Sequence, residues 1–563
     1  MRRFRALVAR LQEHPRAWQS ALVLAVLAVL HGRTLLGHVA MSLDRFRFND
    51  DVRVLIHPQF RWEDAQLFPH DPAVDYFLAS LPECYRLVYR ALGPLVGVAA
   101  LSKALPYVLL AVVLACLARI AGRLSGAAAV LGALSLALGS AYVLGRMVGG
   151  LPRAFALPFL AAGALALVEG RARTLALLAV LAAGFYPAAG LTLGAALALL
   201  FCLPARDRGS AETWSLKVRG GWLVLTALLA VLVVAPTAWR LRPWGPAIGP
   251  ELVAAYPEAG PNGRFDPMDR APFPALPQAA ALPMEAALVG DGDAPIPALS
   301  LRKVGGLVAA SFVFVGLCGW AVLARRRSDA RRLLVLPAAL TLCHTLAWLL
   351  EPRLFLPERY VAYAVPLVAL LAAPTAFGAL RDGARRWQRF VPLAYNVVLL
   401  VALGATGVTW SGLSVYVPPP ERPLYAKLAS LPSNALIAAI PSDAIDSIPY
   451  LTRRSVLFTR ETHMPFHVGY ADLMRRRARA LYAAYFSPSV AELARFTRQW
   501  GVTHVLFDRR HAIVRPTYFA PFEADIAAAF DHGKAEGFAM SKLPASATVF
   551  EVGPYVLVDA TRL

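Results

Sequence analysis

The sequence predicts an α-helical polytopic membrane protein with about eleven transmembrane helices, followed by a C-terminal α/β segment. The chain has 563 residues, of which 58% are hydrophobic and 17% are charged, whereas soluble proteins carry about 25% charged residues. Its mean hydropathy is +0.52. Apolar stretches recur as far as residue 413, and about 20 such residues suffice to cross a bilayer. After residue 413, short apolar strands alternate with amphipathic helices, which favours a small layered sheet.

The apolar stretches place the predicted membrane helices. The first follows a basic N-terminus, as in a secretory signal, but it is long enough to span the bilayer. His38 also occupies the position where a cleavage site needs a small residue, so we expect an uncleaved anchor. The region 152–204 is the least regular, because Pro187 interrupts it. The predicted spans are residues 18–40, 99–120, 125–145, 152–169, 172–186, 187–204, 221–240, 304–324, 332–351, 359–380 and 390–413.

The arginines indicate the orientation of the chain. The formal net charge of +21 comes mainly from arginine, and these residues gather in every second loop. Cytoplasmic loops are enriched in Lys and Arg, so the N-terminus is predicted in the cytoplasm and residues 41–98, 241–303 and 414–563 outside. The arginine- and alanine-rich composition suggests a bacterium, and therefore its cytoplasmic membrane. A nucleic-acid partner is not expected, since no basic surface is interleaved with aromatic residues.

Two domains are predicted. Residues 1–413 form a transmembrane domain, whose outer segment 41–98 includes helices lying along the membrane surface. The outer segment 241–303 is rich in proline and glycine and is predicted to be an irregular loop. Residues 414–563 form an extracytoplasmic α/β domain. Its predicted strands are residues 435–440, 455–458, 502–507 and a pair within 549–558, and its predicted helices are residues 470–485 and 490–499.

The first outer segment carries the most informative residues, the adjacent acids Asp50 and Asp51. Acids this close to a membrane span are uncommon without a function. A carboxylate near a low-dielectric boundary has a raised proton affinity, which suits a general base or a metal ligand. The alternative is a structural role, as a helix cap or in a salt bridge to Arg47 or Arg53.

His70 and Asp71 follow in the same segment, between two prolines. The prolines restrict the backbone and so hold both side chains in a defined direction. We expect a second acid or a metal ligand here, so that Asp51, His70 and Asp71 are the candidate metal ligands. The alternative is that Asp71 caps a helix that begins near residue 73.

Some arginines lie in segments predicted to be outside, although Lys and Arg are otherwise concentrated in the loops predicted to be cytoplasmic. These outer arginines therefore indicate anionic partners. Arg146 and Arg153 lie on either side of a glycine-rich turn between two spans. Glu358, Arg359 and Tyr360 begin a later span, with an acid, a cation and a phenol close to the bilayer interface. Guanidinium groups match phosphate in a bidentate manner. The alternatives are contact with lipid headgroups and an internal Glu–Arg ion pair.

Three other patterns carry less information. Asp291 and Asp293 have a carboxylate spacing used for metals, but polar loops often contain it. His463 and His467 are four residues apart without further ligands, which is a weak indication of zinc. His344 lies within a span and is interpreted as a packed, hydrogen-bonded residue. The sequence contains no phosphate-binding glycine-rich loop and no nucleophile elbow.

The layout resembles the C-type (GT-C) membrane glycosyltransferases, which include protein O-mannosyltransferases, oligosaccharyltransferase catalytic subunits and aminoarabinose transferases. The resemblance rests on Asp50-Asp51, on Arg359-Tyr360, and on the segments 150–153 and 500–504. The chain lacks the WWD-type motif of oligosaccharyltransferases. The resemblance implies a polyprenyl-phosphate-linked sugar as donor and a glycan, lipid or protein acceptor at the outer face of the membrane.

The same resemblance implies roles for the candidate residues. Asp50 or Asp51 would act as general base in an inverting displacement, and Arg146, Arg153 and Arg359, or a divalent metal, would stabilise the leaving phosphate. The outer loop would cover the acceptor. Other functions remain open, namely a non-enzymatic lipid or polysaccharide transporter, an O-antigen ligase or polymerase, and a membrane-anchored scaffold. A transporter is expected to carry polar or broken-helix positions at mid-membrane, whereas the polar residues here gather on one face.

Overall fold

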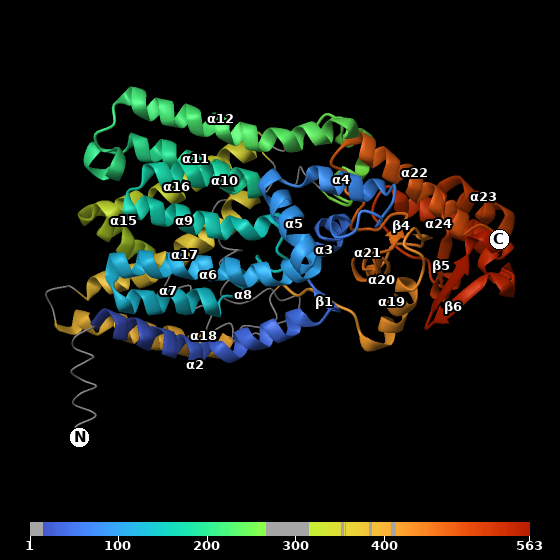
Figure 1. The fold of residues 1–563 in the computed structure, drawn as a ribbon, viewed down its shortest axis with the longest axis horizontal. Helices are drawn as coiled ribbons and strands as arrows, with labels where there is room; N and C mark the ends of the chain where they lie inside the picture. The colour runs from blue at the N-terminus through green and yellow to red at the C-terminus, as the bar shows by residue number, and fades with distance from the viewer. Residues whose placement is uncertain (1–14, 266–314, 351–353, 355, 382–385, 407–411) are drawn as a thin grey trace, which may run out of the picture.

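The computed structural model describes residues 15–265, 315–350, 354, 356–381, 386–406 and 412–563. A helical bundle occupies one end of the molecule and a β-sheet with flanking helices occupies the other (Figure 1). Within the described residues, six helical segments are long and apolar enough to cross a membrane, and three shorter helices are also apolar. The helices of the bundle are α2 (Pro15–Leu43), α6 (Val98–Ser125), α7 (Ala127–Gly139), α9 (Ala156–Glu169), α10 (Ala172–Phe185), α11 (Pro187–Cys202), α12 (Leu216–Leu241), α15 (Ser328–Leu333), α16 (Val335–Leu349), α17 (Glu358–Leu380) and α18 (Val391–Thr406).

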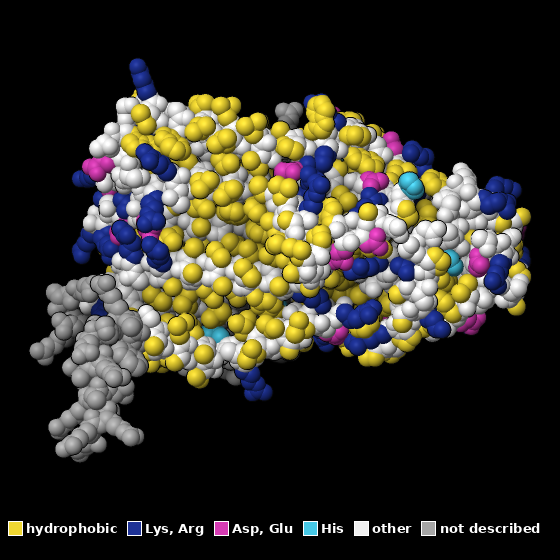
Figure 2. Space-filling view, in the orientation of Figure 1, with side chains coloured by type: hydrophobic (Ala, Val, Ile, Leu, Met, Phe, Trp, Pro, Cys, Tyr) yellow, Lys and Arg dark blue, Asp and Glu magenta, His cyan; other side chains and the backbone are white. Residues whose placement is uncertain are grey.

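The surface of the bundle has the pattern of a membrane protein. Apolar side chains cover its middle, and Lys and Arg side chains gather at the end away from the sheet (Figure 2). Leu228, Val231 and Leu232 of α12 are among the exposed apolar residues. Arg171 and Arg206 are exposed cations from loops that were predicted to be cytoplasmic. Which end faces the cytoplasm stays a prediction.

The first outer segment, residues 41–98, folds into short helices that lie between the helical bundle and the sheet (Figure 1). Asp71 accepts hydrogen bonds from the backbone N–H groups of Ala73 and Val74 and so caps α4. α5 is amphipathic and runs across the end of the bundle (Figure 1). The predicted helices in this segment are therefore present. They are α3 (Val52–Leu55), the 3₁₀ helix η1 (His57–Trp62), α4 (Pro72–Ser80) and α5 (Glu83–Val96).

The C-terminal segment contains a five-stranded mixed sheet with strand order β4-β3-β5-β7-β6. β3 pairs in parallel with β4 and β5, and β7 pairs antiparallel with β5 and β6. Each strand and helix predicted here is present within a few residues, although β4 is only two residues long. The elements are β3 (Leu436–Ala438), β4 (Ser455–Val456), β5 (His504–Asp508), β6 (Thr548–Val552), β7 (Tyr555–Asp559), α20 (Asp443–Asp446), α21 (Ile448–Thr452), α22 (Val468–Tyr485), α23 (Val490–Trp500) and α24 (Phe522–Glu536).

Two further contacts join distant parts of the chain. β1 (Arg47–Phe48), directly after α2, pairs antiparallel with β2 (Val415–Tyr416), which follows the last predicted span. The described part of the 241–303 loop is irregular apart from three short 3₁₀ helices, and Ala247 forms an isolated β-bridge with His467. These helices are η5 (Arg242–Trp244), η6 (Val253–Ala255) and η7 (Pro257–Ala259). The first outer segment, this loop and the C-terminal segment therefore meet at one end of the bundle.

Candidate active site

The turn between β1 and α3 carries the paired acids. The Asn49 side-chain amide donates to the Gly412 carbonyl oxygen at 3.0 Å, and the Asp50 backbone N–H donates to the Ser414 hydroxyl oxygen at 3.0 Å. The Asn49 side-chain oxygen accepts from the Asp51 N–H at 3.1 Å. Asp51 stands at the N-cap position of α3, but its carboxylate makes no capping bond. The turn is thus held by backbone and amide contacts, and both carboxylates are left for other partners.

A third carboxylate joins the pair. Glu461, between β4 and α22, offers an oxygen that lies with one oxygen each of Asp50 and Asp51 in a group whose members are all within 4.8 Å of one another. The Glu461 side chain is 10% exposed. Burial raises the pKa of the Glu461 carboxyl, Arg264 lowers it, and the neighbouring Asp50 and Asp51 charges raise it again. These three residues are called the acid cluster below.

Arg53 lies beneath the acid cluster with only 3% of its side chain exposed. Its guanidinium pairs with Asp50, lies 3.5 Å from Glu461 Oε1 and lies 3.3 Å from Asp443 Oδ1. Fully buried Asp446 is a further neighbour, and burial raises the pKa of its carboxyl to about 7 although Arg53 opposes that rise. A buried cation in this position links the first outer segment to α20 and to the segment after β4.

Two more guanidinium groups contact the acid cluster. Arg153 pairs with Asp51 and also donates to Asn49 Oδ1 at 3.1 Å. Arg264, from the described part of the 241–303 loop, donates to Glu461 Oε2 at 2.9 Å. Each carboxylate of the acid cluster therefore has an arginine partner, and the charges of the three carboxylates are balanced by three guanidinium groups.

On the bundle side, Arg153 adjoins a group of buried phenols and cations. The Tyr186 phenol lies within electrostatic reach of both Arg153 and Arg359. Its ring meets the Tyr363 ring edge-on, with 5.5 Å between the centroids. Tyr363 is 1% exposed. Neither phenol oxygen has a hydrogen bond to a described residue outside this group, although the two hydroxyls adjoin each other and Tyr363 adjoins the Arg359 guanidinium. The Arg153 Nε is also without a hydrogen-bond partner among the described residues.

Arg146 belongs to the same group. Its guanidinium carbon lies 4.7 Å from the centroid of the Tyr142 ring, and the Tyr142 hydroxyl donates to the Ala362 carbonyl oxygen. Tyr142 is also within electrostatic reach of Arg359 and Tyr363. The six side chains form what we call the arginine–tyrosine cluster: Arg146, Arg153, Arg359, Tyr142, Tyr186 and Tyr363. The three arginines predicted from the sequence are thus brought into one region.

The Gly149-Gly150 turn explains how Arg153 reaches the acids. Both glycines have positive φ, at 90° and 59°, a conformation that residues with a Cβ adopt at a cost. A Cβ on Gly149 would lie 3.2 Å from the Asn49 Cβ, and one on Gly150 would lie 2.7 Å from the Tyr89 hydroxyl. The turn therefore packs directly on the first outer segment and holds Arg153 beside it.

His70 and Asp71 take a different position. Asp71 caps α4, and burial raises the pKa of its carboxyl while nearby Arg477 lowers it. His70 is exposed with φ at 55°. Among the described residues, the one group of three possible metal ligands includes Asp51 but neither of these two. The structure therefore shows the alternative role for Asp71, and the predicted metal role of both residues stays a prediction.

The three residues at the start of α17 point to different neighbours. Arg359 joins the arginine–tyrosine cluster, and its Nε lies 3.4 Å from the exposed carboxylate of Glu358. Tyr360 packs instead with Cys343 and Ala347, and its hydroxyl donates to the Leu354 carbonyl oxygen at 3.0 Å. Tyr360 therefore supports the helix, and a binding role for Glu358 or Tyr360 stays a prediction.

The acid cluster also offers a donor set for a cation. Its ligands are all carboxylate oxygens, which hard divalent ions such as Mg²⁺ and Ca²⁺ prefer. The spacing of the three oxygens fits such an ion. A cation at this position would compete with the three arginine partners, so the same carboxylates serve either a metal or the guanidinium groups.

The remaining sequence patterns have structural roles or lie outside the described residues. His463 contacts the Tyr518 hydroxyl through Nδ1 at 3.2 Å, whereas His467 contacts the Tyr76 hydroxyl at 2.8 Å. His344 Nδ1 contacts the Pro357 carbonyl oxygen at 3.1 Å, as expected for a packed histidine. The Asp291–Asp293 pattern lies outside the described residues.

Several site residues were missed by sequence reasoning. Glu461 was overlooked beside the histidines that follow it. Arg53 was considered only as a salt-bridge partner, although it is buried among several acids. Tyr186 and Tyr363 lie in apolar helices, where a tyrosine looks like an ordinary packing residue. One signal was available for Glu461, since it follows a parallel strand and ligands often bind at the carboxyl ends of such strands.

Comparison with solved structures identifies the fold. ArnT from Cupriavidus metallidurans in the apo state has a TM-score of 0.51 and 14% identity, covering 95% of this chain and 98% of that chain. The oligosaccharyltransferase of Archaeoglobus fulgidus, in complex with Zn and sulfate, has a TM-score of 0.46 and 11% identity over 85% and 68%. Arabinofuranosyltransferase AftD from Mycobacteria has a TM-score of 0.42 and 16% identity over 86% and 35%.

No family model and no curated protein sequence matches the chain. At 14% identity, the likeness to ArnT concerns the fold. The similarity to ArnT extends along nearly the whole of both chains. The chain therefore has the fold of ArnT, and its described helices include six that are long and apolar enough to cross a membrane.

Proposed function

We propose that this protein transfers a sugar from a polyprenyl-phosphate donor to an acceptor at the outer face of a bacterial cytoplasmic membrane. The observation that carries the proposal is the Arg153–Asp51 contact, which joins the acid cluster to the arginine–tyrosine cluster. A carboxylate for proton transfer and guanidinium groups for a phosphate therefore adjoin on a GT-C fold.

The arginine–tyrosine cluster is suited to the phosphate of the donor. Arg359 and Arg153 offer guanidinium donors, and the hydroxyls of Tyr186 and Tyr363, which have no hydrogen bond to a described residue outside the cluster, offer two more. Buried donors without partners cost free energy, which a bound phosphate would recover. Preorganised donors of this kind stabilise the charge that develops on the leaving phosphate.

Asp51 is the better placed of the two acids to act as base. Asp50 is paired with Arg53, which is buried among carboxylates and is not part of the arginine–tyrosine cluster. Asp51 is paired with Arg153, which is itself a member of the arginine–tyrosine cluster. A bound phosphate would draw Arg153 toward itself, and the Asp51 carboxylate would then be free to accept a proton.

The transfer is then a single displacement. The acceptor hydroxyl oxygen forms a bond to the anomeric carbon, and its proton passes to Asp51. The bond between the anomeric carbon and the phosphate oxygen breaks, and its electron pair stays on the polyprenyl phosphate. A divalent cation bound by the acid cluster would supply further positive charge at this point.

The test is transfer from tritiated polyprenyl-phosphate sugars by the full-length protein in liposomes, with a membrane extract as acceptor source. Asp51→Asn should lower kcat/KM by about 10²–10⁴-fold, the usual contribution of general acid–base catalysis. Asp75→Asn, in the same outer segment but paired with Arg61, is the matched control and should keep activity. Unchanged transfer by Asp51→Asn would remove the base assignment, and no transfer by the wild type from any donor would favour a transporter or scaffold.

A further inference from the structure

The ribbon formed by β1 and β2 shapes the turn that carries the paired acids. Each strand has only two residues, and Arg47 lies directly opposite Tyr416. The Val417 N–H adds a hydrogen bond to the Phe46 carbonyl oxygen at 2.9 Å. A two-stranded ribbon is marginally stable on its own, so this one depends on the contacts of its side chains.

Cations and aromatic rings alternate along the ribbon and its flanks. The Arg47 guanidinium carbon lies 4.1 Å from the centroid of the Tyr416 ring. The Arg45 guanidinium carbon lies 4.8 Å from the centroid of the Phe46 ring. Arg422 contacts both rings, at 4.4 Å from the Phe46 centroid and 5.8 Å from the Tyr416 centroid. We call these five residues the cationic patch.

The cationic patch carries more positive charge than its neighbours neutralise. The Arg422 guanidinium lies 3.5 Å from a carboxylate oxygen of Asp44. Arg45 is exposed and Arg47 is half-buried, and neither makes an ion pair or a side-chain hydrogen bond with a residue that the structure describes. Three guanidinium groups held against two rings with one carboxylate form a surface that favours an anion.

The cationic patch lies where the apolar surface of the bundle ends. Arg45 comes two residues after Leu43, the exposed last residue of α2. Figure 2 shows Lys and Arg side chains gathered at this level, in the region where Figure 1 shows β1 and α19 (Arg422–Ala429). A bilayer around the apolar surface therefore places its headgroups beside the patch, where arginine and tyrosine are well suited to meet them.

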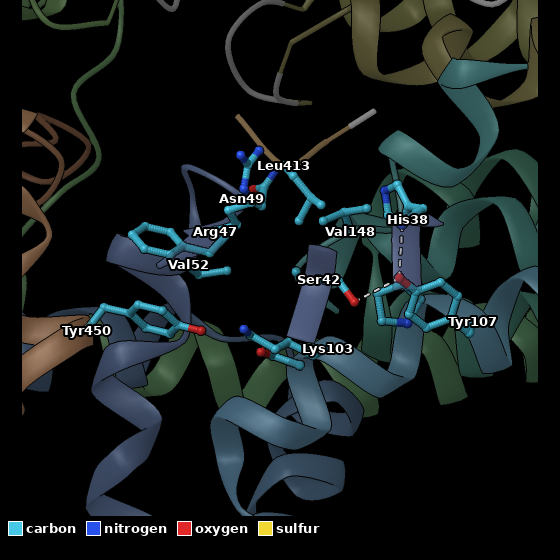
Figure 3. Close-up of a pocket in the computed structure, with 14 residues that line it drawn as sticks. His38, Ser42, Arg47, Asn49, Val52, Lys103, Tyr107, Val148, Leu413 and Tyr450 are labelled. Carbon is cyan, nitrogen blue, oxygen red and sulfur yellow. Dashed lines mark hydrogen bonds between the residues drawn. The ribbon is translucent and has the colours of Figure 1, made fainter. Parts of the chain in front are cut away.

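The cationic patch also adjoins the turn of the paired acids. Arg47 and Asn49 are two residues apart, and Figure 3 shows them next to each other at the edge of a small hollow. The Asn49 amide donates to the Gly412 carbonyl oxygen, and the Asp50 N–H donates to the Ser414 hydroxyl oxygen. The segments next to both strands therefore build this turn, and a contact that holds β1 against β2 also holds the paired acids.

We propose that the cationic patch binds the phosphodiester headgroups of anionic membrane phospholipids, and that this contact stabilises the turn of the paired acids. A phosphate between the guanidinium groups offsets their mutual repulsion. The membrane is the source of this phosphate, because the patch lies at the edge of the apolar surface. The binding goes beyond the transferase function proposed above, whereas its effect on transfer rests on that function.

The binding test measures amide hydrogen exchange of the full-length protein in nanodiscs. One set contains phosphatidylcholine alone and the other a mixture with phosphatidylglycerol. An arginine near an anionic surface adds about fivefold in affinity. The two arginines without an acid partner should therefore slow exchange in the peptides that contain Asp50 and Val417 by about 25-fold in the mixture.

Three variants test which residues cause the slowing. Arg45→Gln should reduce the slowing by about fivefold, and Arg45→Lys should retain it because the charge remains. Arg495→Gln removes an exposed arginine of α23, at the end of the molecule away from the bundle (Figure 1), and should leave the slowing unchanged. The ratio between the two membranes is compared within each variant, so a general loss of stability does not imitate the effect.

Two results would overturn the site. The first is exchange of the ribbon at the same rate in both membranes. The second is equal slowing in Arg45→Gln and the wild type. If soluble glycerol phosphate slows exchange in phosphatidylcholine nanodiscs as much as phosphatidylglycerol does, the patch binds a free anion and the lipid assignment is wrong.

The effect on transfer has its own readout. Transfer by the wild type should be faster in the mixed membrane, and Arg45→Gln should lose most of this gain. Slowed exchange with equal transfer in both membranes would overturn the link to the paired acids. Exchange does not require transfer, so a wild type that is protected by phosphatidylglycerol but inactive with every donor would refute the transferase function alone. An active wild type without this protection would refute the lipid site alone.

Discussion

The acid cluster and the arginine–tyrosine cluster share Arg153 but differ in how their polar groups are satisfied. Every carboxylate of the acid cluster has a guanidinium partner. In the arginine–tyrosine cluster, the buried hydroxyls of Tyr186 and Tyr363 have no hydrogen bond to a described residue outside the cluster. Buried polar groups are normally paired, so we expect a ligand on this side, which we call the unpaired side. The acid cluster, the paired side, keeps one such buried atom, the Arg53 Nε beneath it.

The largest effect on stability is expected at Arg53. Arg53→Met leaves Asp50, Glu461 and Asp446 without their buried cation, and breaking a buried ion pair costs about 3–5 kcal/mol. Thermal unfolding of the purified protein measures this loss. Arg422→Met, at a half-exposed pair with Asp44, is the control and should cost about 1 kcal/mol or less. If Arg53→Met and the wild type unfold at the same temperature, Arg53 does not stabilise the fold as the buried partner of these acids.

The next effect falls on catalysis. Arg359→Met should lower kcat by about 10²–10³-fold, the range seen when one donor that stabilises developing charge is removed. The melting temperature should fall only slightly, because the ion-pair partner of the Arg359 Nε is the exposed Glu358 carboxylate, and such exposed pairs contribute about 1 kcal/mol or less. If Arg359→Met melts at a much lower temperature than the wild type but keeps its kcat, Arg359 has a structural role like that of Arg53 and not a catalytic one.

The stability of the protein should depend on pH through Asp446, the buried acid beside the acid cluster. Burial raises the pKa of Asp446 to about 7, whereas an unfolded aspartate titrates near 4. Between these values the folded protein binds more protons than the unfolded chain, so stability falls as the pH rises and is lowest above pH 7. Asp446→Asn should remove this part of the slope and raise the melting temperature at about pH 8 relative to the wild type by several degrees. If the melting temperatures of the two proteins change equally with pH across this range, the Asp446 carboxyl does not have the raised pKa that its burial implies.

The smallest effect is expected at a single phenol. Tyr363→Phe removes a buried hydroxyl that has no hydrogen bond to a described residue outside the arginine–tyrosine cluster, so stability should stay the same or rise slightly. If the hydroxyl donates to the donor phosphate, kcat/KM should fall about 3–10-fold, as for one hydrogen bond. Tyr425→Phe, at a buried tyrosine whose hydroxyl donates to the Ala444 carbonyl oxygen, is the matched control and should leave kcat/KM unchanged.

The sequence predicted much of the architecture. Hydrophobic runs identify membrane helices because lipid demands continuous apolar segments, and every predicted span within the described residues coincides with a helix. The alternation after residue 413 predicted the sheet and its helices. The order of the strands was not predictable, because pairing depends on distant segments that carry no local signal.

The candidate site was predictable in part. Asp50 and Asp51 stood out because charge near a span is conspicuous, and the outer arginines did so for the same reason. Glu461 did not stand out, since an acid in a soluble segment is ordinary and only folding brings it beside Asp51. The role of Asp71 could not be decided from the sequence, because an acid between two prolines suits both a metal ligand and a helix cap. The structure shows Asp71 as the cap of α4.

The pairing of β1 with β2 has a consequence for biosynthesis. The turn that bears Asp50 is fastened to Ser414, a residue made only after all the predicted spans. A nascent chain that has inserted its early helices therefore still lacks the strand that shapes its reactive turn. The turn that carries the paired acids is therefore completed only after the final predicted membrane segment has been made.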